Sequence, residues 1–167
     1  MDDINAEKRI VYFDMDGVLA DFDGAFYKLF GKTTDVGDEE LWRLIETYGK
    51  ARFFMGLPWL PGSEQMFKYA YDNFLQVKIL SATGKSDAVD GQTTKGKLAW
   101  LRHHIPSLRM DDIILVPNKH KKRHYSKPGD IIIDDNETVI QEWTRKGGIA
   151  IFHKTAPETI EILKKYV

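Results

Sequence analysis

Short runs of apolar residues recur along the chain, with longer stretches of mixed character between them. Each run is rich in β-branched side chains, as is typical of strands covered on both faces in a parallel sheet. The runs are Ile10 to Phe13, Val77 to Leu80, Ile113 to Val116, Ile131 to Ile133 and Ile149 to Phe152. They predict the strands of one sheet.

Segments with helical periodicity lie between these runs and carry their apolar residues on one face. One expected helix opens at Gly62-Ser63-Glu64, and a second runs from Asn136 to the stop at Gly147-Gly148. A third begins near Pro157, and a fourth spans Lys95 to His104 with Leu98 and Leu101 facing inward. Strands that alternate with helices indicate right-handed βαβ units. The sequence therefore predicts an α/β fold, a three-layer α/β/α doubly wound parallel sheet.

One region breaks this alternation. Residues 21–61 contain no strand-like run, and they combine many aromatic side chains with several glycines. We expect a helical cap inserted after the first strand, over the carboxyl end of that strand. The expected organisation is a core of residues 1–20 and 62–167 with a cap of residues 21–61.

Amino-acid composition limits the number of domains and the classes of partner. A chain of 167 residues with 43% hydrophobic content suits one domain with a small insertion. Lysine plus arginine (24) nearly balances aspartate plus glutamate (25), so net charge gives no argument for a nucleic-acid or membrane partner. Without cysteine there is no disulfide or thiolate metal site. The polar segment Met1 to Arg9 and the absence of a membrane-length apolar run favour a soluble cytoplasmic protein.

Two pairs of acidic residues are the main candidates for a functional site. Asp14 and Asp16 follow the first apolar run, and Asp134-Asp135 end the fourth. In a parallel sheet both pairs lie at the same edge, where open α/β sheets bind their ligands. One such pair is more simply read as turn or helix-cap residues. Two pairs that converge suit Mg²⁺, which binds a few carboxylates together with water and a substrate phosphate.

The order of these residues resembles the motifs of haloacid dehalogenase (HAD) superfamily phosphatases. The motif residues are Asp14-x-Asp16-Gly17 with Val18-Leu19, the strand-ending Ser81, a downstream lysine, and Asp134-Asp135. More narrowly, the chain resembles the 5'(3')-deoxyribonucleotidase family. That likeness lies in Asp14 to Phe22, Phe53-Phe54, Leu57-Pro58, Leu60-Pro61-Gly62 and Ile131 to Asp135.

The resemblance implies roles for the acids. Asp14 would be the nucleophile that forms an aspartyl-phosphate. Asp16 would protonate the leaving oxygen and then deprotonate water, and its backbone carbonyl would bind Mg²⁺. Asp135 would be a direct metal ligand with Asp134 close by, although the sequence leaves open which of these two binds directly. The expected metal site thus comprises Asp14, Asp16, Asp134 and Asp135.

The resemblance also implies groups that hold the phosphate. The Ser81 hydroxyl would contact a phosphate oxygen, and a lysine would stabilise the phosphoryl charge. Lys122 fits that lysine best and Lys127, which precedes a proline, comes second. The sequence does not exclude two further candidates, Lys119 and Lys121. Lys97 resembles another phosphate-facing lysine.

Aromatic residues of the expected cap are candidates for substrate binding. Phe22 stands where the family has a base-stacking phenylalanine, and Trp42 and Phe54 are further candidates. A base stacked on an aromatic ring gains about 1–3 kcal/mol. For most of the aromatic residues, however, a small core within the insertion is the simpler interpretation.

The sequence thus predicts a Mg²⁺-dependent phosphatase that hydrolyses (deoxy)ribonucleoside monophosphates through an aspartyl-phosphate. Two alternatives stay open: a HAD-type 3'-phosphatase acting on polynucleotide ends, suggested by the basic run Lys119 to Arg123, and a non-catalytic HAD-like binding domain. The expected partner is a small-molecule nucleoside monophosphate. No membrane is expected, and the overall charge argues against nucleic acid. Base, sugar, phosphate position and oligomeric state, a homodimer included, are left open.

Overall fold

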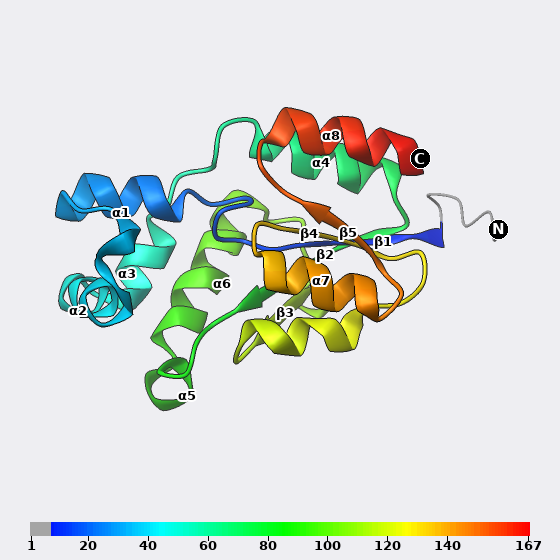
Figure 1. The fold of residues 1–167 in the computed structure, drawn as a ribbon. Helices are drawn as coiled ribbons and strands as arrows, with labels where there is room; N and C mark the ends of the chain where they lie inside the picture. Colours follow the sequence, from blue (N-terminus) through cyan, green and yellow to red (C-terminus); the bar gives the residue numbers. More distant parts are fainter. Residues whose placement is uncertain (1–7) are drawn as a thin grey trace.

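Five parallel strands form one sheet in the computed structural model, which describes residues 8–167 (Figure 1). The sheet order is β3-β2-β1-β4-β5. The strands are β1 (Ile10–Phe13), β2 (Gln76–Ala82), β3 (Ile113–Val116), β4 (Ile131–Asp134) and β5 (Ile149–Phe152). All five predicted strands are therefore present, and the α/β fold is confirmed. The first seven residues of the segment 1–20, with most of the polar segment Met1 to Arg9, lie outside the described residues.

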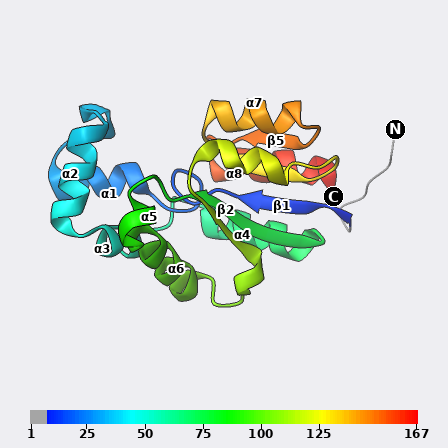
Figure 2. The same ribbon diagram turned by 90° about the horizontal axis from the view of Figure 1, so that it is seen from below.

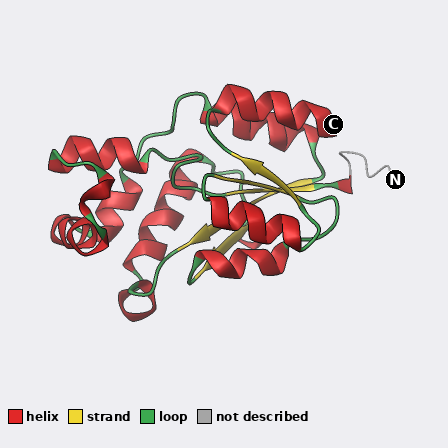
Figure 3. Cartoon of the chain, in the orientation of Figure 1, coloured by secondary structure: helices red, strands yellow, loops and turns green. Residues whose placement is uncertain are grey.

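Helices cover both faces of the sheet, as Figures 1 and 2 show from two directions. Helices α4 (Ser63–Asn73) and α8 (Ala156–Leu163) pack together on one face, and α7 (Glu137–Arg145) lies on the other with the 3₁₀ helix η4 (Lys119–Tyr125). Helix α6 (Gln92–His104) follows the short α5 (Asp87–Asp90), and the 3₁₀ helices η3 (Met110–Asp112) and η5 (Lys164–Tyr166) complete this part. Figure 3 shows the three layers as helix, strand, helix.

Successive side chains of a strand point to opposite faces of the sheet, so each strand contributes to the core on both faces. Val11 and Phe13 of β1 pack in the larger apolar cluster, which includes Met66 of α4, whereas Tyr12 faces a smaller cluster. In that smaller cluster the Tyr12 ring packs edge-to-face against Trp143 of α7, with ring centroids 5.2 Å apart. Both faces of β1 are thus buried, which explains why its sequence is apolar throughout.

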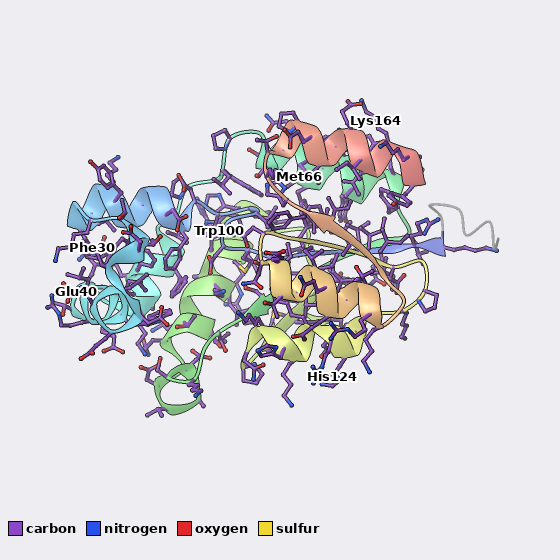
Figure 4. The ribbon with its side chains drawn as sticks, in the orientation of Figure 1. Phe30, Glu40, Met66, Trp100, His124 and Lys164 are labelled. Atoms are coloured by element: carbon purple, nitrogen blue, oxygen red, sulfur yellow. The ribbon has the colours of Figure 1, made fainter. Side chains whose placement is uncertain are left out.

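A separate group of helices extends beyond the carboxyl edge of the sheet. It comprises α1 (Phe22–Phe30), η2 (Thr34–Val36), α2 (Asp38–Tyr48) and α3 (Lys50–Met55). Figure 4 marks Phe30 and Glu40 in this group, away from Met66 of α4 and Lys164 of η5. Helix α3 packs on α6, the pair of helices with the most extensive contact in the described chain. The segment is helical, as the sequence predicts.

Two details of α6 differ from expectation. The helix begins at Gln92 rather than near Lys95, and Leu98 is only half-buried while Leu101 is buried. The buried face instead passes through Gly96 and Trp100, because α6 packs closely on α3 and sends a lysine toward the sheet edge. Among residues 8–167, no helix has both the length and the apolar character needed to cross a membrane.

Candidate active site

Three neighbouring strands bring polar side chains to one edge of the sheet. Phe13 of β1 is in register with Ile133 of β4. The residues that follow them, Asp14 and Asp134, therefore lie side by side at the carboxyl edge. Ser81 lies near the end of β2, which pairs with β1 on its other side. The predicted motifs thus meet in space although they are far apart in the sequence.

A tight turn follows β1 and positions the first acidic pair. The carbonyl of Met15 accepts hydrogen bonds from the N–H groups of Leu19 and Ala20 at 2.8 and 2.9 Å. Gly17 has a φ of +80°, and a Cβ at this position would collide with the carboxylate of Asp135. Glycine is therefore required twice here, for its backbone conformation and for the close approach of that acid.

Three carboxylates cluster at this edge. Oxygens of Asp14, Asp134 and Asp135 lie within 4.8 Å of one another. Asp134 is fully buried, and its two oxygens accept from Lys122 Nζ at 2.7 Å and from the backbone N–H of Asn136 at 2.9 Å. Asp135 lines the adjacent cavity, so it is better placed than Asp134 to bind a cation directly.

Electrostatics in the cluster favours a bound positive charge. Burial raises the pKa of Asp135 to about 7, and the charges of Asp14 and Asp134 add to the effect. Burial and the charge of Asp14 also raise the pKa of Asp134, against the opposing effect of Lys122. Hard oxygen donors that are crowded in this way are suited to a divalent cation such as Mg²⁺. The donor set therefore fits the metal that the sequence predicts.

Lys122 is the lysine that lies among these acids. Its side chain is 3% exposed, and its Nζ lies 3.1 Å from Asp14 and 2.7 Å from Asp134. Burial lowers the pKa of Lys122, but the two carboxylates more than offset this and the net pKa is raised. Lys127, the second candidate, is exposed in the loop just before β4, where its carbonyl accepts from Asp130 N–H. It therefore lies at the opposite edge of the sheet.

Lys97 of α6 reaches the same edge from the other side. Its Nζ donates to Ser81 Oγ at 2.6 Å, to the Ala82 carbonyl at 2.9 Å and to the Asp16 carboxylate at 3.0 Å. The side chain is 2% exposed, and Nζ lies 5.4 Å from the centre of the Phe54 ring. Lys97 thus links the acidic turn, the end of β2 and the helical group.

Asp16 lies at the cavity with a carboxyl oxygen that is unpaired within the described chain. Burial raises its pKa, although the nearby Lys97 acts in the opposite direction. Its Oδ1 has no hydrogen-bond partner within residues 8–167, and the residue lines the cavity. A carboxyl group in this position can donate a proton to a reacting oxygen and accept one from water.

A cavity of about 440 Å³ opens between this edge and the helical group. Asp16 and Asp135 line it from the sheet edge, and three aromatic residues of the helical group, Phe22, Trp42 and Phe54, form its aromatic wall. All three aromatic residues that the sequence singles out thus line the same space. A volume of this size is within the usual range of small-molecule sites.

The aromatic wall is also part of a packed cluster. The Phe22 ring lies 5.1 Å from that of Phe53 in an edge-to-face arrangement, and the rings of Trp42 and Phe54 lie 6.4 Å apart. Phe54 is only 2% exposed, whereas Phe22 and Trp42 are half-buried. The two interpretations made from the sequence, a small core and a substrate wall, therefore apply to the same residues.

Sequence reasoning missed several groups that line the cavity. Asp23, Lys85, Thr93 and Asn118 do so. Of the two further lysine candidates from the sequence, Lys119 also lines the cavity, whereas Lys121 is exposed on η4. A sequence signal exists for Thr93, which stands four residues before Lys97 and therefore shares its helix face. The others depend on the paths of loops, for which the sequence gives no periodic signal.

A protein-family model and solved structures match the chain. The family described as "5' nucleotidase, deoxy (Pyrimidine), cytosolic type C protein" matches residues 8–162. No curated protein sequence matches. A hydrolase from Streptococcus pneumoniae TIGR4 is similar in fold, with a TM-score of 0.54 and 15% identity over 93% of this chain and 98% of that one.

A second solved structure shares the fold. It is D,D-heptose 1,7-bisphosphate phosphatase from Burkholderia thailandensis, with a TM-score of 0.50 and 13% identity over 93% of this chain and 85% of that chain. At such low identity these structures establish the fold alone. The family match covers nearly all of the described chain.

Proposed function

The chain belongs to the 5' nucleotidase, deoxy (pyrimidine), cytosolic type C family of HAD-superfamily hydrolases, and we propose that it is a Mg²⁺-dependent phosphatase of nucleoside monophosphates, with deoxyribonucleotides preferred. Family membership makes it a phosphomonoester hydrolase of the nucleotidase type. The observation that carries the more specific proposal is a cavity lined by Asp16, by Asp135 of the acid cluster and by three aromatic side chains. The ion pair of Asp14 with Lys122 belongs to the same cluster.

In the proposed first step, a carboxylate oxygen of Asp14 attacks the phosphorus atom of the substrate. The ester bond between phosphorus and the nucleoside oxygen breaks, and Asp16 gives its proton to that oxygen. The raised pKa of Asp16 supports this, because the acid must be protonated when the substrate arrives. The nucleoside leaves, and the phosphoryl group remains on Asp14.

In the second step, Asp16 accepts a proton from water, and the water oxygen attacks phosphorus. The bond to Asp14 breaks, which releases inorganic phosphate and restores the enzyme. Lys122 neutralises the Asp14 carboxylate and the phosphoryl oxygens. Ser81 and Lys97 would hold a phosphate oxygen, and their hydrogen bond to each other supports a joint role.

We assign the metal site to Asp14, Asp135 and the backbone carbonyl of Asp16. Asp134 supports the site by fixing Lys122, since both of its oxygens are already occupied. When bound, Mg²⁺ would offset the negative charges of Asp14 and the phosphate. The raised pKa of Asp135 supports this assignment, because an acid in such surroundings is stabilised by a cation.

The helical group is proposed to act as a cap, residues 21–61, over a core of residues 1–20 and 62–167. Its aromatic side chains Phe22, Trp42 and Phe54 would contact the base. A cavity of about 440 Å³ is of the size of small-molecule sites, which supports a mononucleotide as the substrate.

One observation favours a second candidate, the 3'-phosphatase that acts on polynucleotide ends. Lys85 and Lys119 line the same cavity and could contact a further phosphate group. This candidate predicts that KM for a 3'-phosphorylated oligonucleotide rises steeply with salt. The mononucleotidase predicts little salt dependence and a lower KM for mononucleotides. The third interpretation, a non-catalytic binding domain, is not supported, because the family is one of hydrolases.

The proposal is tested by phosphate release from a panel of nucleoside 5'- and 3'-monophosphates, with Mg²⁺ and with a chelator. We expect release from at least one deoxyribonucleotide, its loss on chelation and its loss in Asp14→Asn. Release by Asp14→Asn at the wild-type rate would refute the mechanism. A cytoplasmic location remains a prediction of the sequence.

A further inference from the structure

One buried hydroxyl at the cavity has no hydrogen-bond partner. Thr93 is 1% exposed, it lines the cavity, and its Oγ1 finds no partner among residues 8–167. Buried hydroxyl groups are almost always hydrogen-bonded, because an unpaired one loses its water without replacement. An exception at the wall of a binding cavity therefore calls for an explanation.

Neighbouring hydroxyl groups show that the local structure readily satisfies such groups. Ser81 Oγ accepts from Lys97 at 2.6 Å, Thr83 Oγ1 donates to the Val116 carbonyl at 3.3 Å, and Thr94 Oγ1 donates to Asp87 at 2.5 Å. Among the buried side-chain hydroxyl groups of residues 8–167, that of Thr93 is the one left without a hydrogen bond. Its partner is therefore to be sought in the cavity.

The position of Thr93 indicates which part of a substrate it would meet. Lys97 lies four residues later, one helical turn of about 5.4 Å along α6, and faces the phosphate end through Ser81 and Asp16. Thr93 is therefore one turn farther from the phosphate end. Gly96, on the same side of α6, packs against Phe54, which forms part of the aromatic wall.

We propose that Thr93 determines substrate specificity by hydrogen-bonding the polar edge of the nucleobase. The inference rests on the proposed function and deepens it. A base stacked on the aromatic wall presents carbonyl, amino or ring nitrogen groups at its rim, and a threonine hydroxyl can donate to or accept from each of them. The bond would form only when a nucleotide is bound, which accounts for the unpaired hydroxyl in the free enzyme.

The test compares three phosphate esters that differ in what they carry besides phosphate: the best deoxyribonucleoside 5'-monophosphate, 2-deoxyribose 5-phosphate and p-nitrophenyl phosphate. Thr93→Val replaces the hydroxyl by a methyl group of similar shape. We expect kcat/KM for the nucleotide to fall about tenfold, as for loss of one net hydrogen bond. The other two esters should be unaffected, and Thr93→Ser should restore most of the nucleotide activity.

Stability and a matched control separate this role from a structural one. Because the hydroxyl is unpaired in the free enzyme, Thr93→Val should leave the melting temperature unchanged or raise it. Thr94→Val removes the neighbouring hydroxyl, which is hydrogen-bonded to Asp87. This variant should lower the melting temperature without changing the preference among the three esters.

Each outcome has a distinct meaning. An equal loss with all three esters, or a loss with 2-deoxyribose 5-phosphate as large as with the nucleotide, overturns the base contact. Unchanged nucleotide hydrolysis in Thr93→Val does the same while the proposed function stands. A wild-type enzyme that cleaves p-nitrophenyl phosphate but no nucleotide overturns the proposed function and this inference with it.

Discussion

Lys122 shows how one residue can serve both stability and chemistry. Its ammonium group lies between two carboxylates at a site that water hardly reaches. Charges are stable in such surroundings only when each has a partner. The same ammonium group faces the position where the proposed phosphoryl group would carry negative charge. Removing it should therefore affect folding and catalysis together.

We predict that Lys122→Met lowers the free energy of unfolding by about 3–5 kcal/mol, because it leaves two buried carboxylates without their cation. Urea denaturation of the metal-free protein measures this. Phosphatase kcat should fall by about 100-fold or more, since a preorganised positive charge is lost. Lys122→Arg keeps the charge and should recover part of the stability.

Lys127→Met is the matched control for this prediction. Lys127 is exposed in the loop that leads into the amino end of β4, whereas Lys122 contacts Asp134 at the carboxyl end of that strand. Its removal should change neither urea midpoint nor kcat. If Lys122→Met were as stable as the wild type, the buried ion pairs would not hold the site together as described.

At the scale of elements, the strands follow closely from the sequence, whereas the helical contacts do not. Strands such as β4 are buried on both faces and must be apolar throughout, so the run Ile131 to Ile133 is sufficient to find them. The same reasoning predicts that Asp14 and Asp134 lie close together, because parallel strands end at the same edge of the sheet. Leu98 shows the limit, since the buried face of α6 is set by its contact with α3.

The choice among the lysines shows a similar limit. The segment from Asn118 to Ser126 forms the 3₁₀ helix η4 with its flanking residues, and such a segment has no strong periodic pattern in the sequence. Only the path of the chain decides that Lys122 points inward while Lys121 is exposed. Thr93 was missed for another reason: a threonine on a helix has no special meaning until a cavity is seen beside it.

The contact between α3 and α6 depends on a glycine. A Cβ at Gly96 would lie 2.7 Å from the Ala51 carbonyl oxygen and 2.8 Å from Phe54 Cβ. Real atoms do not approach so closely, so any larger residue must push the two helices apart. Because Phe54 belongs to the aromatic wall, such a shift would also alter the cavity.

We predict that Gly96→Ala lowers the free energy of unfolding by about 1–3 kcal/mol, the usual effect of overpacking. It should also raise KM for the nucleotide more than KM for p-nitrophenyl phosphate. Both changes are measured on one preparation, by denaturation and by steady-state kinetics. Lys95→Ala, at an exposed position on the same helix, should have little effect on either. Unchanged stability in Gly96→Ala would contradict the close packing of these helices.

At the scale of the whole molecule, the acid cluster connects stability to pH and to metal. Asp135 has a pKa of about 7 in the folded state against an ordinary value of 3.8, because of burial first and of Asp14 second. Between these values the folded protein binds more protons than the unfolded chain. Linkage then requires the stability of the metal-free protein to fall as pH rises through this window. Asp16 and Asp130, whose pKa values are also raised, act in the same direction.

Two histidines act in the opposite direction. Burial lowers the pKa of His153 and of His104, so below the ordinary value of 6.5 the unfolded chain binds more of their protons. Their contribution to stability therefore rises with pH and hides part of the effect of the acids. A difference between the wild type and Asp135→Asn removes this background, because the histidines are common to both proteins.

We therefore predict that, in the presence of a chelator, Asp135→Asn and the wild type have similar unfolding midpoints near pH 4, which is close to the ordinary pKa of 3.8. Above pH 7, the wild type should be the less stable of the two proteins. Because Asp135 is exposed to solvent, screening reduces the difference. Added Mg²⁺ should reverse the order at high pH, since it binds the folded wild type through the ionised carboxylate and stabilises it by mass action. Thermal unfolding across this pH range, with and without Mg²⁺, measures both effects. Equal stabilisation of the two proteins by Mg²⁺ would show that Asp135 is not a metal ligand.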